Sequence, residues 1–252
     1  MVLLGQVAWV SGAGTGFGSA IARRLAQDGA RVACLDIDGE AADRCADSLD
    51  RLGLDAMALA CDVADSASVA AAAQAVARRW AHITTVVNNA GVSQTIARMD
   101  QTPEAEIDRI FAVNVKSLQH VAVHLLPFLR AGGGGTVINI ASVGGMRPRP
   151  GMAWYNASKA AVISLTQSMA LEYARHAVRV NAIAPVAART PMLETMLGET
   201  LEDSTRALAA SIPLGRLAEP EDITAAVSFL ASPSAAFMTG VVLPVDGGRL
   251  IS

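Results

Sequence analysis

Short runs rich in β-branched residues alternate with longer alanine-rich amphipathic runs along almost the whole chain. Such alternation predicts units in which a helix connects one strand to the next parallel strand. The expected strands are Gln6–Ser11, Arg31–Asp36, Ala56–Asp62, Thr84–Asn88, Thr136–Ala141, Val178–Ala184 and Gly240–Val245. The expected helices are Gly16–Asp28, Gly39–Leu52, Ser66–Ala81, Thr102–Ala131, Trp154–His176 and Glu219–Ala231. This order constrains the fold more than any other feature of the sequence.

The element order predicts one α/β domain over residues 1–252. Right-handed crossovers build a doubly wound, Rossmann-like arrangement, with a seven-stranded parallel sheet and helices on both faces. The chain has 252 residues, of which 52% are apolar, so it can bury a core of that size. Ligands of such sheets bind at the carboxyl ends of the strands, near the point where strand order reverses.

The charges are nearly balanced, with 20 Lys and Arg against 23 Asp and Glu dispersed along the chain. This distribution offers no basic stripe for nucleic acid and no polybasic membrane anchor. No segment approaches the roughly 20 unbroken apolar residues that a membrane span needs. The apolar N-terminal segment lacks a basic region and a cleavage site. We therefore expect a soluble, cytoplasmic protein without nucleic-acid or membrane partners.

The cysteines and histidines do not form a recognisable ligand pattern. Cys34, Cys45 and Cys61 are an odd number without CxxC spacing, and two of them lie in apolar strand-like runs. This pattern is typical of buried reduced thiols in a reducing compartment. The four histidines fall on or at the ends of expected helices without ligand spacing among themselves. No metal is therefore expected.

A glycine-rich segment joins the first expected strand to the first expected helix, with Gly12, Gly16 and Gly18 in the order GxxxGxG. A merely tight turn would use the same residues. At this position, however, a turn without side chains also brings backbone N–H groups against a pyrophosphate at the helix N-terminus. The segment therefore indicates a dinucleotide site.

Asp36 ends the second expected strand, where a carboxylate can accept hydrogen bonds from an adenosine ribose and repel a 2′-phosphate. Neither Thr15 nor Ile37 offers the basic side chain that a 2′-phosphate requires. NAD is therefore favoured over NADP. Asp62 and Val63 close the third expected strand, where Asp62 either binds the adenine edge or caps the following helix.

Tyr155 and Lys159 are four residues apart on one expected helix, so the phenol and the ammonium lie on the same face. A tyrosine with a pKa of about 10 is a poor base at neutral pH. Lowering that pKa by two to three units needs roughly 3–4 kcal/mol, which a cation at about 4 Å supplies at an effective dielectric near 20. An ordinary amphipathic helix also carries this spacing, so the pair gains meaning only from its context.

That context resembles the short-chain dehydrogenase/reductase family over essentially the whole length of the chain. The matched features, in chain order, are Gly12-xxx-Gly16-x-Gly18, Asp36, Asp62-Val63, Asn88-Asn89-Ala90-Gly91, Asn114, Ser142, Tyr155-xxx-Lys159, Pro185, Thr190 and Asp246-Gly247-Gly248. Each motif is weak alone, but their order and spacing are specific.

The resemblance implies a catalytic set of Asn114, Ser142, Tyr155 and Lys159. Tyr155 is expected to exchange a proton with the substrate oxygen, and Ser142 to hydrogen-bond the same oxygen. Lys159 would lower the pKa of Tyr155 and bind the nicotinamide ribose, while Asn114 would hold a water that connects Lys159 to solvent.

The resemblance and the residues together imply NAD as cofactor. The residues expected to bind it are Gly12, Thr15, Gly16, Phe17, Gly18, Asp36, Ile37, Asp62, Val63, Asn89, Ala90, Gly91, Tyr155, Lys159, Pro185, Ala188 and Thr190. The family usually has glycine directly after the proline that ends the sixth strand, whereas this chain has Val186. A β-branched residue does not readily take a positive φ, so the nicotinamide loop is either built differently or does not need that freedom.

Substrate contacts are expected from the loops 91–99, 144–153 and 189–211. The candidate substrate residues are Ser142, Arg147, Met152 and Tyr155. The expected activity is NAD-dependent interconversion of a secondary alcohol and a ketone. The alternatives are an NADPH-dependent carbonyl or 3-oxoacyl thioester reductase, and a dinucleotide-binding regulatory protein without turnover. Helices 102–131 and 154–176 carry more apolar positions than one sheet face can cover, which together with the resemblance predicts a homotetramer, or at least a dimer.

Overall fold

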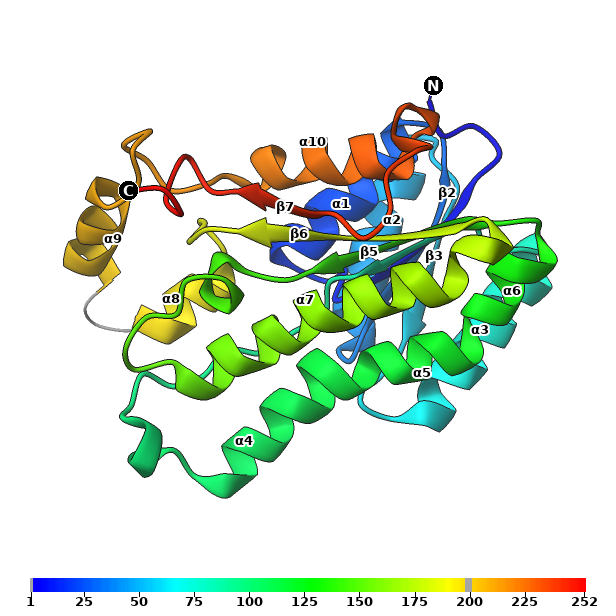
Figure 1. Cartoon of the computed structure of the whole chain (residues 1–252). Coiled ribbons are helices and arrows are strands. Elements are labelled where there is room, and N and C mark those ends of the chain that lie inside the picture. The colour runs from blue at the N-terminus through cyan, green and yellow to red at the C-terminus, as the bar shows by residue number, and fades with distance from the viewer. Residues whose placement is uncertain (1, 198–200) are drawn as a thin grey trace.

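The computed structural model describes residues 2–197 and 201–252 and centres on a seven-stranded parallel sheet (Figure 1). The strands are β1 (Val7–Ser11), β2 (Arg31–Asp36), β3 (Ala56–Ala60), β4 (Thr85–Asn88), β5 (Gly135–Ile140), β6 (Val178–Pro185) and β7 (Val242–Val245). Their order is β3-β2-β1-β4-β5-β6-β7, so the direction of winding reverses between β1 and β4. The predicted doubly wound, Rossmann-like sheet is confirmed.

Helices cover both faces of this sheet, as Figure 1 shows. The helices are α1 (Gly16–Gln27), α2 (Gly39–Asp50), α3 (Ser66–Trp80), α4 (Glu104–Phe111), α5 (Ser117–His124), α6 (Leu126–Ala131), α7 (Ala153–Tyr173), α8 (Pro191–Leu197), α9 (Leu201–Ala210) and α10 (Pro220–Ala231). One core cluster joins the sheet to α1, α2 and α10, and a second joins the opposite face to α3, α5, α6 and α7.

The residues of β1 show why two layers of helices are needed. Ala8 and Val10 belong to one core cluster, whereas Val7 and Trp9 belong to the other. All four are fully buried. Successive side chains point to opposite faces of a strand, so a strand that is apolar throughout must be covered on both sides.

The prediction of one continuous helix over 102–131 is wrong. The chain forms α4, then a π-helical turn at Ala112–Lys116, then α5 and α6. The break at Leu125 follows from Pro127 in the first turn of α6, because proline lacks the N–H that would continue the helix and its ring clashes with the preceding turn. The π-helical turn holds Asn114.

The segment expected to be a polar loop over 189–211 contains α8 and α9, while residues 198–200 lie outside the described part of the chain. Leu193 and Leu208 pack with Ile212 and Leu217 in a small apolar cluster. The segment is therefore folded against the body of the protein through its apolar side chains.

All three cysteines are buried and unbridged, as expected. The Cys34 and Cys45 sulfurs lie 3.6 Å apart. Within residues 2–197 and 201–252, no helix combines the length and the apolar character needed to cross a membrane.

Candidate active site

A cavity of about 470 Å³ opens at the carboxyl ends of the strands. Its walls come from the segments that follow β1 to β6 and from the last residues of the chain. This is the edge at which ligands of doubly wound sheets bind. The expected cofactor residues all line the cavity except Gly18. Of the expected catalytic residues, Ser142, Tyr155 and Lys159 line it.

The turn after β1 is held by a compact hydrogen-bond network. Gly12 has a φ of +64°, and its carbonyl oxygen accepts a hydrogen bond from Asn89 Nδ2 at 3.1 Å. The Ser11 hydroxyl oxygen accepts from the backbone N–H groups of Asn89 and Ala90. Gly18 lies beneath this turn, where an added Cβ would come within 1.8 Å of the Gly12 oxygen. Gly18 thus shapes the turn from below.

Asp36 is anchored at the end of β2 with its carboxylate at the cavity. Oδ2 accepts a hydrogen bond from the Gly14 N–H at 2.9 Å, and Oδ1 accepts from the Asp38 N–H at 3.1 Å. Each carboxylate oxygen has more than one lone pair, so both keep acceptor capacity for hydroxyl groups. Ile37 beside it is 73% exposed and lines the same end of the cavity.

The loop after β3 resolves one alternative left open by the sequence. Asp62 does not cap α3, because Asp65 is the N-cap residue and accepts from the Ala67 N–H. Asp62 lines the cavity, and Oδ1 accepts from the Ala64 N–H at 2.8 Å. The Val63 carbonyl accepts a hydrogen bond from His120 Nδ1 at 2.9 Å, which makes this buried histidine a packing residue of the loop.

The segment after β6 does not use the freedom of glycine. Among the described non-glycine residues only Ala81 and Ala177 have positive φ, so Val186 does not. The Val186 N–H donates to the Val245 carbonyl at 3.2 Å, and Ala188 pairs with Ala218 in an isolated bridge. This pairing holds Ala188 and Thr190 at the cavity wall. The valine is thus accommodated without a positive φ.

Tyr155 and Ser142 meet inside the cavity. Ser142 follows β5 in extended conformation, and its oxygen accepts from the Gly144 N–H at 3.1 Å. Tyr155 lies in the first turn of α7. Burial raises the pKa of Tyr155, while its hydrogen bond with Ser142 and the charge of Arg149 lower it. The cation that opposes this rise of the Tyr155 pKa is Arg149, whereas Lys159 was expected to do so.

Lys159 lies one turn further along α7, with Nζ 5.8 Å from the centroid of the Tyr155 ring. Its ammonium group donates to the Ile140 carbonyl at 2.8 Å. Burial lowers the pKa of Lys159 from 10.5 to about 8. The spacing therefore places both groups on the same helix face as expected, but the ammonium is turned toward the end of β5.

Asn114 lies behind the cavity wall and fastens two elements together. Its Oδ1 accepts from the Val92 N–H at 2.8 Å, and its Nδ2 donates to the Val92 carbonyl and to Ser158 Oγ, each at 3.0 Å. A Cβ added to Gly91 would lie 3.3 Å from Asn114 Oδ1 and 3.5 Å from Lys159 Nζ. Asn114 and Lys159 thus approach each other across Gly91.

One residue that holds Tyr155 was missed from the sequence. Gln94 is buried, and its Oε1 accepts from the N–H groups of Trp154 and Tyr155 at 2.9 and 3.1 Å. These are N–H groups of the first turn of α7, which has no side-chain cap of its own. Gln94 thereby fixes the start of the helix. Gln94 is far from Tyr155 in the sequence, so no local sequence pattern indicates this contact.

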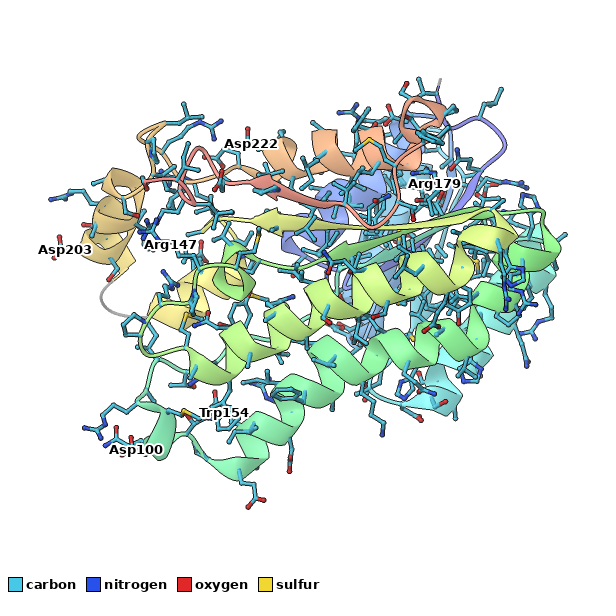
Figure 2. All side chains as sticks on the ribbon, viewed as in Figure 1. Asp100, Arg147, Trp154, Arg179, Asp203 and Asp222 are labelled. Atoms are coloured by element: carbon cyan, nitrogen blue, oxygen red, sulfur yellow. The ribbon has the colours of Figure 1, made fainter. Side chains whose placement is uncertain are left out.

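The far end of the cavity carries the expected Arg147 and Met152 together with Arg149, Arg249 and Leu250, which the site prediction omitted. Arg147 donates to the carbonyl oxygens of Arg249 and Ser252. Figure 2 shows Arg147 at the end of the molecule that holds α8, α9 and the C-terminal segment. The Asp246-Gly247-Gly248 motif could have indicated that the C-terminal segment reaches the cavity. The Asp246 carboxylate accepts hydrogen bonds from the Gly248 and Leu250 N–H groups and folds this segment back.

Residues 12–249 match a family model described as enoyl-(acyl carrier protein) reductase. The chain is 44% identical to 4-formylbenzenesulfonate dehydrogenase TsaC1/TsaC2 of Comamonas testosteroni, over 98% of both chains. It is 37% identical to cis-4-hydroxycyclohexanecarboxylate dehydrogenase of Sinomonas cyclohexanicum, over 96% of both. Among solved structures, 3-ketoacyl-(acyl-carrier-protein) reductase of Brucella melitensis, complexed with NADH, superposes with a TM-score of 0.91 at 39% identity. That match covers 98% of this chain and 99% of the other.

Proposed function

The chain belongs to the short-chain dehydrogenase/reductase family, and on that premise we propose that it is an NAD-dependent oxidoreductase that interconverts a secondary alcohol and a ketone. The observation that carries this proposal is that Ser142, Tyr155 and Lys159 line one cavity, with Ser142 close enough to lower the pKa of Tyr155 and Lys159 one helical turn away. A binding protein without turnover has no use for this arrangement.

The cavity fits a dinucleotide. The turn from Gly12 to Gly18 leaves no room for an additional Cβ at Gly18, and it presents backbone N–H groups at the start of α1. Asp36 would hold the adenosine ribose, and Asn89, Gly91 and Thr190 would line the remainder of the groove. When bound, the nicotinamide ring supplies the acceptor or donor of a hydride.

Tyr155 and Ser142 act on the substrate oxygen. During alcohol oxidation Tyr155, as the phenolate, takes the hydroxyl proton and becomes the phenol, and during ketone reduction the phenol gives its proton to the carbonyl oxygen. The Ser142 hydroxyl hydrogen-bonds the same oxygen and stabilises negative charge that develops on it. Because Ser142 is itself fixed by the Gly144 N–H, it is oriented before substrate enters.

Lys159 and Asn114 would assist this proton transfer without contacting the substrate oxygen. The Lys159 ammonium lies at the cavity wall, from which it would bind the nicotinamide ribose. Asn114 faces it across Gly91 and belongs to a π-helical turn, a type of distortion common at functional sites. We propose that a proton taken up at Tyr155 leaves by way of Lys159 and the region of Asn114.

The test is a Tyr155→Phe variant assayed against a panel of secondary alcohols with NAD, with the absorbance of the reduced cofactor as readout. Loss of the proton-transfer group is expected to reduce kcat/KM by roughly 10²–10⁴-fold while NADH still binds. Tyr173→Phe, at the far end of α7, is the matched control because these are the two tyrosines of the chain. Turnover of Tyr155→Phe within about threefold of the unchanged protein would remove Tyr155 from the mechanism.

The relatives do not identify the substrate, because their names span an aldehyde, a ring alcohol and a 3-ketoacyl thioester. The rival activity is NADPH-dependent reduction of a carbonyl compound or 3-oxoacyl thioester. Asp36 disfavours NADPH as the cofactor, because a carboxylate repels a 2′-phosphate. Binding constants for NADH and NADPH decide between the two, and tighter binding of NADPH would favour the rival.

We also propose that the protein is a cytoplasmic homotetramer, with a homodimer as the alternative. Leu171 on α7 is 84% exposed and Val123 on α5 is 49% exposed, so these helices present apolar side chains away from the sheet. A second copy of the chain would cover them. The three buried, unbridged cysteines fit a reducing compartment. Light scattering during size-exclusion chromatography gives the mass, and a monomer would contradict the proposal.

A further inference from the structure

Apart from Lys159 beside Tyr155, the charged residues that line the cavity are separated into two ends. Asp36 ends β2 and Asp62 follows β3 at one edge of the sheet, whereas Arg147, Arg149 and Arg249 follow β5 and β7 toward the other edge. Among the described lining residues, no carboxylate stands at the arginine end. The described lining of the cavity beyond Tyr155 therefore carries guanidinium groups and no carboxylate.

The backbone of Arg149 is held in place by its loop. Proline residues flank it on both sides and limit its conformations. Its carbonyl oxygen accepts a hydrogen bond from Asn156 Nδ2 at 3.0 Å, which ties the loop to α7 just beyond Tyr155. Its guanidinium group donates to the buried Met152 sulfur at 3.2 Å. The side chain is thus placed at the cavity wall close to the catalytic tyrosine.

Arg249 reaches the same end of the cavity from the C-terminal segment. Asp246 turns this segment back on itself, and Arg147 binds the carbonyl oxygens of Arg249 and Ser252. Arg147 therefore positions the segment, and Arg249 adds its own charge to the wall.

The electrostatics agree with this placement. Burial lowers the pKa of Arg149, and the nearby charge of Arg249 lowers it further. The Arg149 guanidinium lowers the pKa of Tyr155, so its electrostatic field reaches the proposed proton-transfer group. The wall of the cavity also includes Met152, Val186 and Leu193, which are apolar.

We propose that the substrate of this enzyme carries an anionic oxygen group, a carboxylate or sulfonate, which Arg149 and Arg249 bind at the end of the cavity opposite the adenosine carboxylates. An apolar body would then span from this group to the alcohol or carbonyl carbon at Tyr155. Arginine suits this task because its planar donors match two oxygens of such a group at once. The inference rests on the proposed dehydrogenase activity and adds the class of substrate.

The first test compares matched pairs of alcohols that differ only in charge, with NAD and varied substrate concentration. The pairs are 4-(1-hydroxyethyl)benzoate with 4-(1-hydroxyethyl)benzamide, and 3-hydroxybutyrate with 3-hydroxybutyramide. We expect kcat/KM to be at least about tenfold higher for one or both carboxylates than for the corresponding amide. Arg149→Gln and Arg249→Gln should each reduce this preference by about tenfold or more. Arg78→Gln, which changes an exposed arginine of α3 outside the cavity, is the matched control.

Equal turnover of acid and amide, or an equal loss for both in the arginine variants, would overturn the proposal. A second measurement does not depend on turnover: calorimetric binding of benzoate, benzenesulfonate and benzamide to the protein saturated with NADH. Tighter binding of the two anions, weakened in Arg149→Gln and Arg249→Gln, supports the proposal. Equal binding of benzamide, or unchanged anion binding in both folded variants, overturns it. If no alcohol is oxidised, the dehydrogenase proposal fails while the binding result still decides the anion site.

Discussion

Replacing Lys159 by methionine tests the electrostatic cost of burying an ammonium group under the active site. Lys159 is 6% exposed, and burial lowers its pKa from 10.5 to about 8. At about 1.36 kcal/mol per pH unit, that gap corresponds to about 3 kcal/mol of destabilisation of the native protein while the lysine is charged. Methionine has a similar length and no charge, so Lys159→Met removes this cost.

The sign of the effect follows from proton binding. Between pH 8 and 10.5 the unfolded chain keeps the proton on this lysine and the native protein releases it, so the stability of the unchanged protein rises with pH. Below pH 8 both states are protonated and the full cost applies. The stability of Lys159→Met relative to the unchanged protein is therefore highest below pH 8. It should fall by about 3 kcal/mol as the pH is raised to 10.5.

The variant also loses the hydrogen bond to the Ile140 carbonyl, which costs about 1 kcal/mol at every pH and does not change the slope. The assay is urea unfolding of both proteins from pH 7 to 10.5 at one protein concentration. Lys116→Met, which changes the other lysine of the chain at an exposed position, is the matched control. A difference in free energy of unfolding that stays constant within about 0.5 kcal/mol across this range would refute the reasoning.

Asp36→Ala should lower the ratio of NADH to NADPH affinity by roughly tenfold or more, measured by fluorescence titration, because the repelling carboxylate is gone; an unchanged ratio would separate Asp36 from cofactor choice. Gly18→Ala forces a Cβ to within 1.8 Å of the Gly12 carbonyl, so we expect loss of NADH binding and a stability loss of about 1–3 kcal/mol or more. A fully stable variant that binds NADH would show that the turn can move. Ser142→Ala removes a hydrogen bond that lowers the pKa of Tyr155, so the rise of alcohol oxidation with pH should move to higher pH, with kcat reduced roughly 10²-fold. An unmoved pH profile would contradict that contact.

The fold was predictable because its signals are local. Alternating strands and helices follow from the periodicity of apolar residues within short windows, and parallel order follows from the length of the connections. The failure over 102–131 had a local cause as well, since Pro127 stands inside the expected helix. The π-helical turn around Asn114 had no such signal, because a distortion of one turn depends on what packs against it.

The position of the expected site residues was predictable to the extent that each follows a strand. The carboxyl ends of parallel strands meet at one edge of the sheet. Strand order alone therefore predicts that four of the site residues gather there, namely Gly12, Asp36, Asn89 and Ser142. Gln94 and Arg249 could not be found in this way. Their positions depend on contacts between segments about 60 or more residues apart, such as the bonds from Gln94 to the start of α7.

The sequence alone determined which chemical groups share a helix face or a sheet edge, because helical spacing and strand order set those neighbours. Tyr155 and Lys159 are such a pair. Only the tertiary structure decided which charges act on which groups, because burial and the direction of each side chain depend on the whole packed chain. It turned the Lys159 ammonium toward the Ile140 carbonyl and brought Arg149 within electrostatic reach of Tyr155. Electrostatic energy depends on distance and on the surrounding dielectric, and neither is contained in sequence spacing.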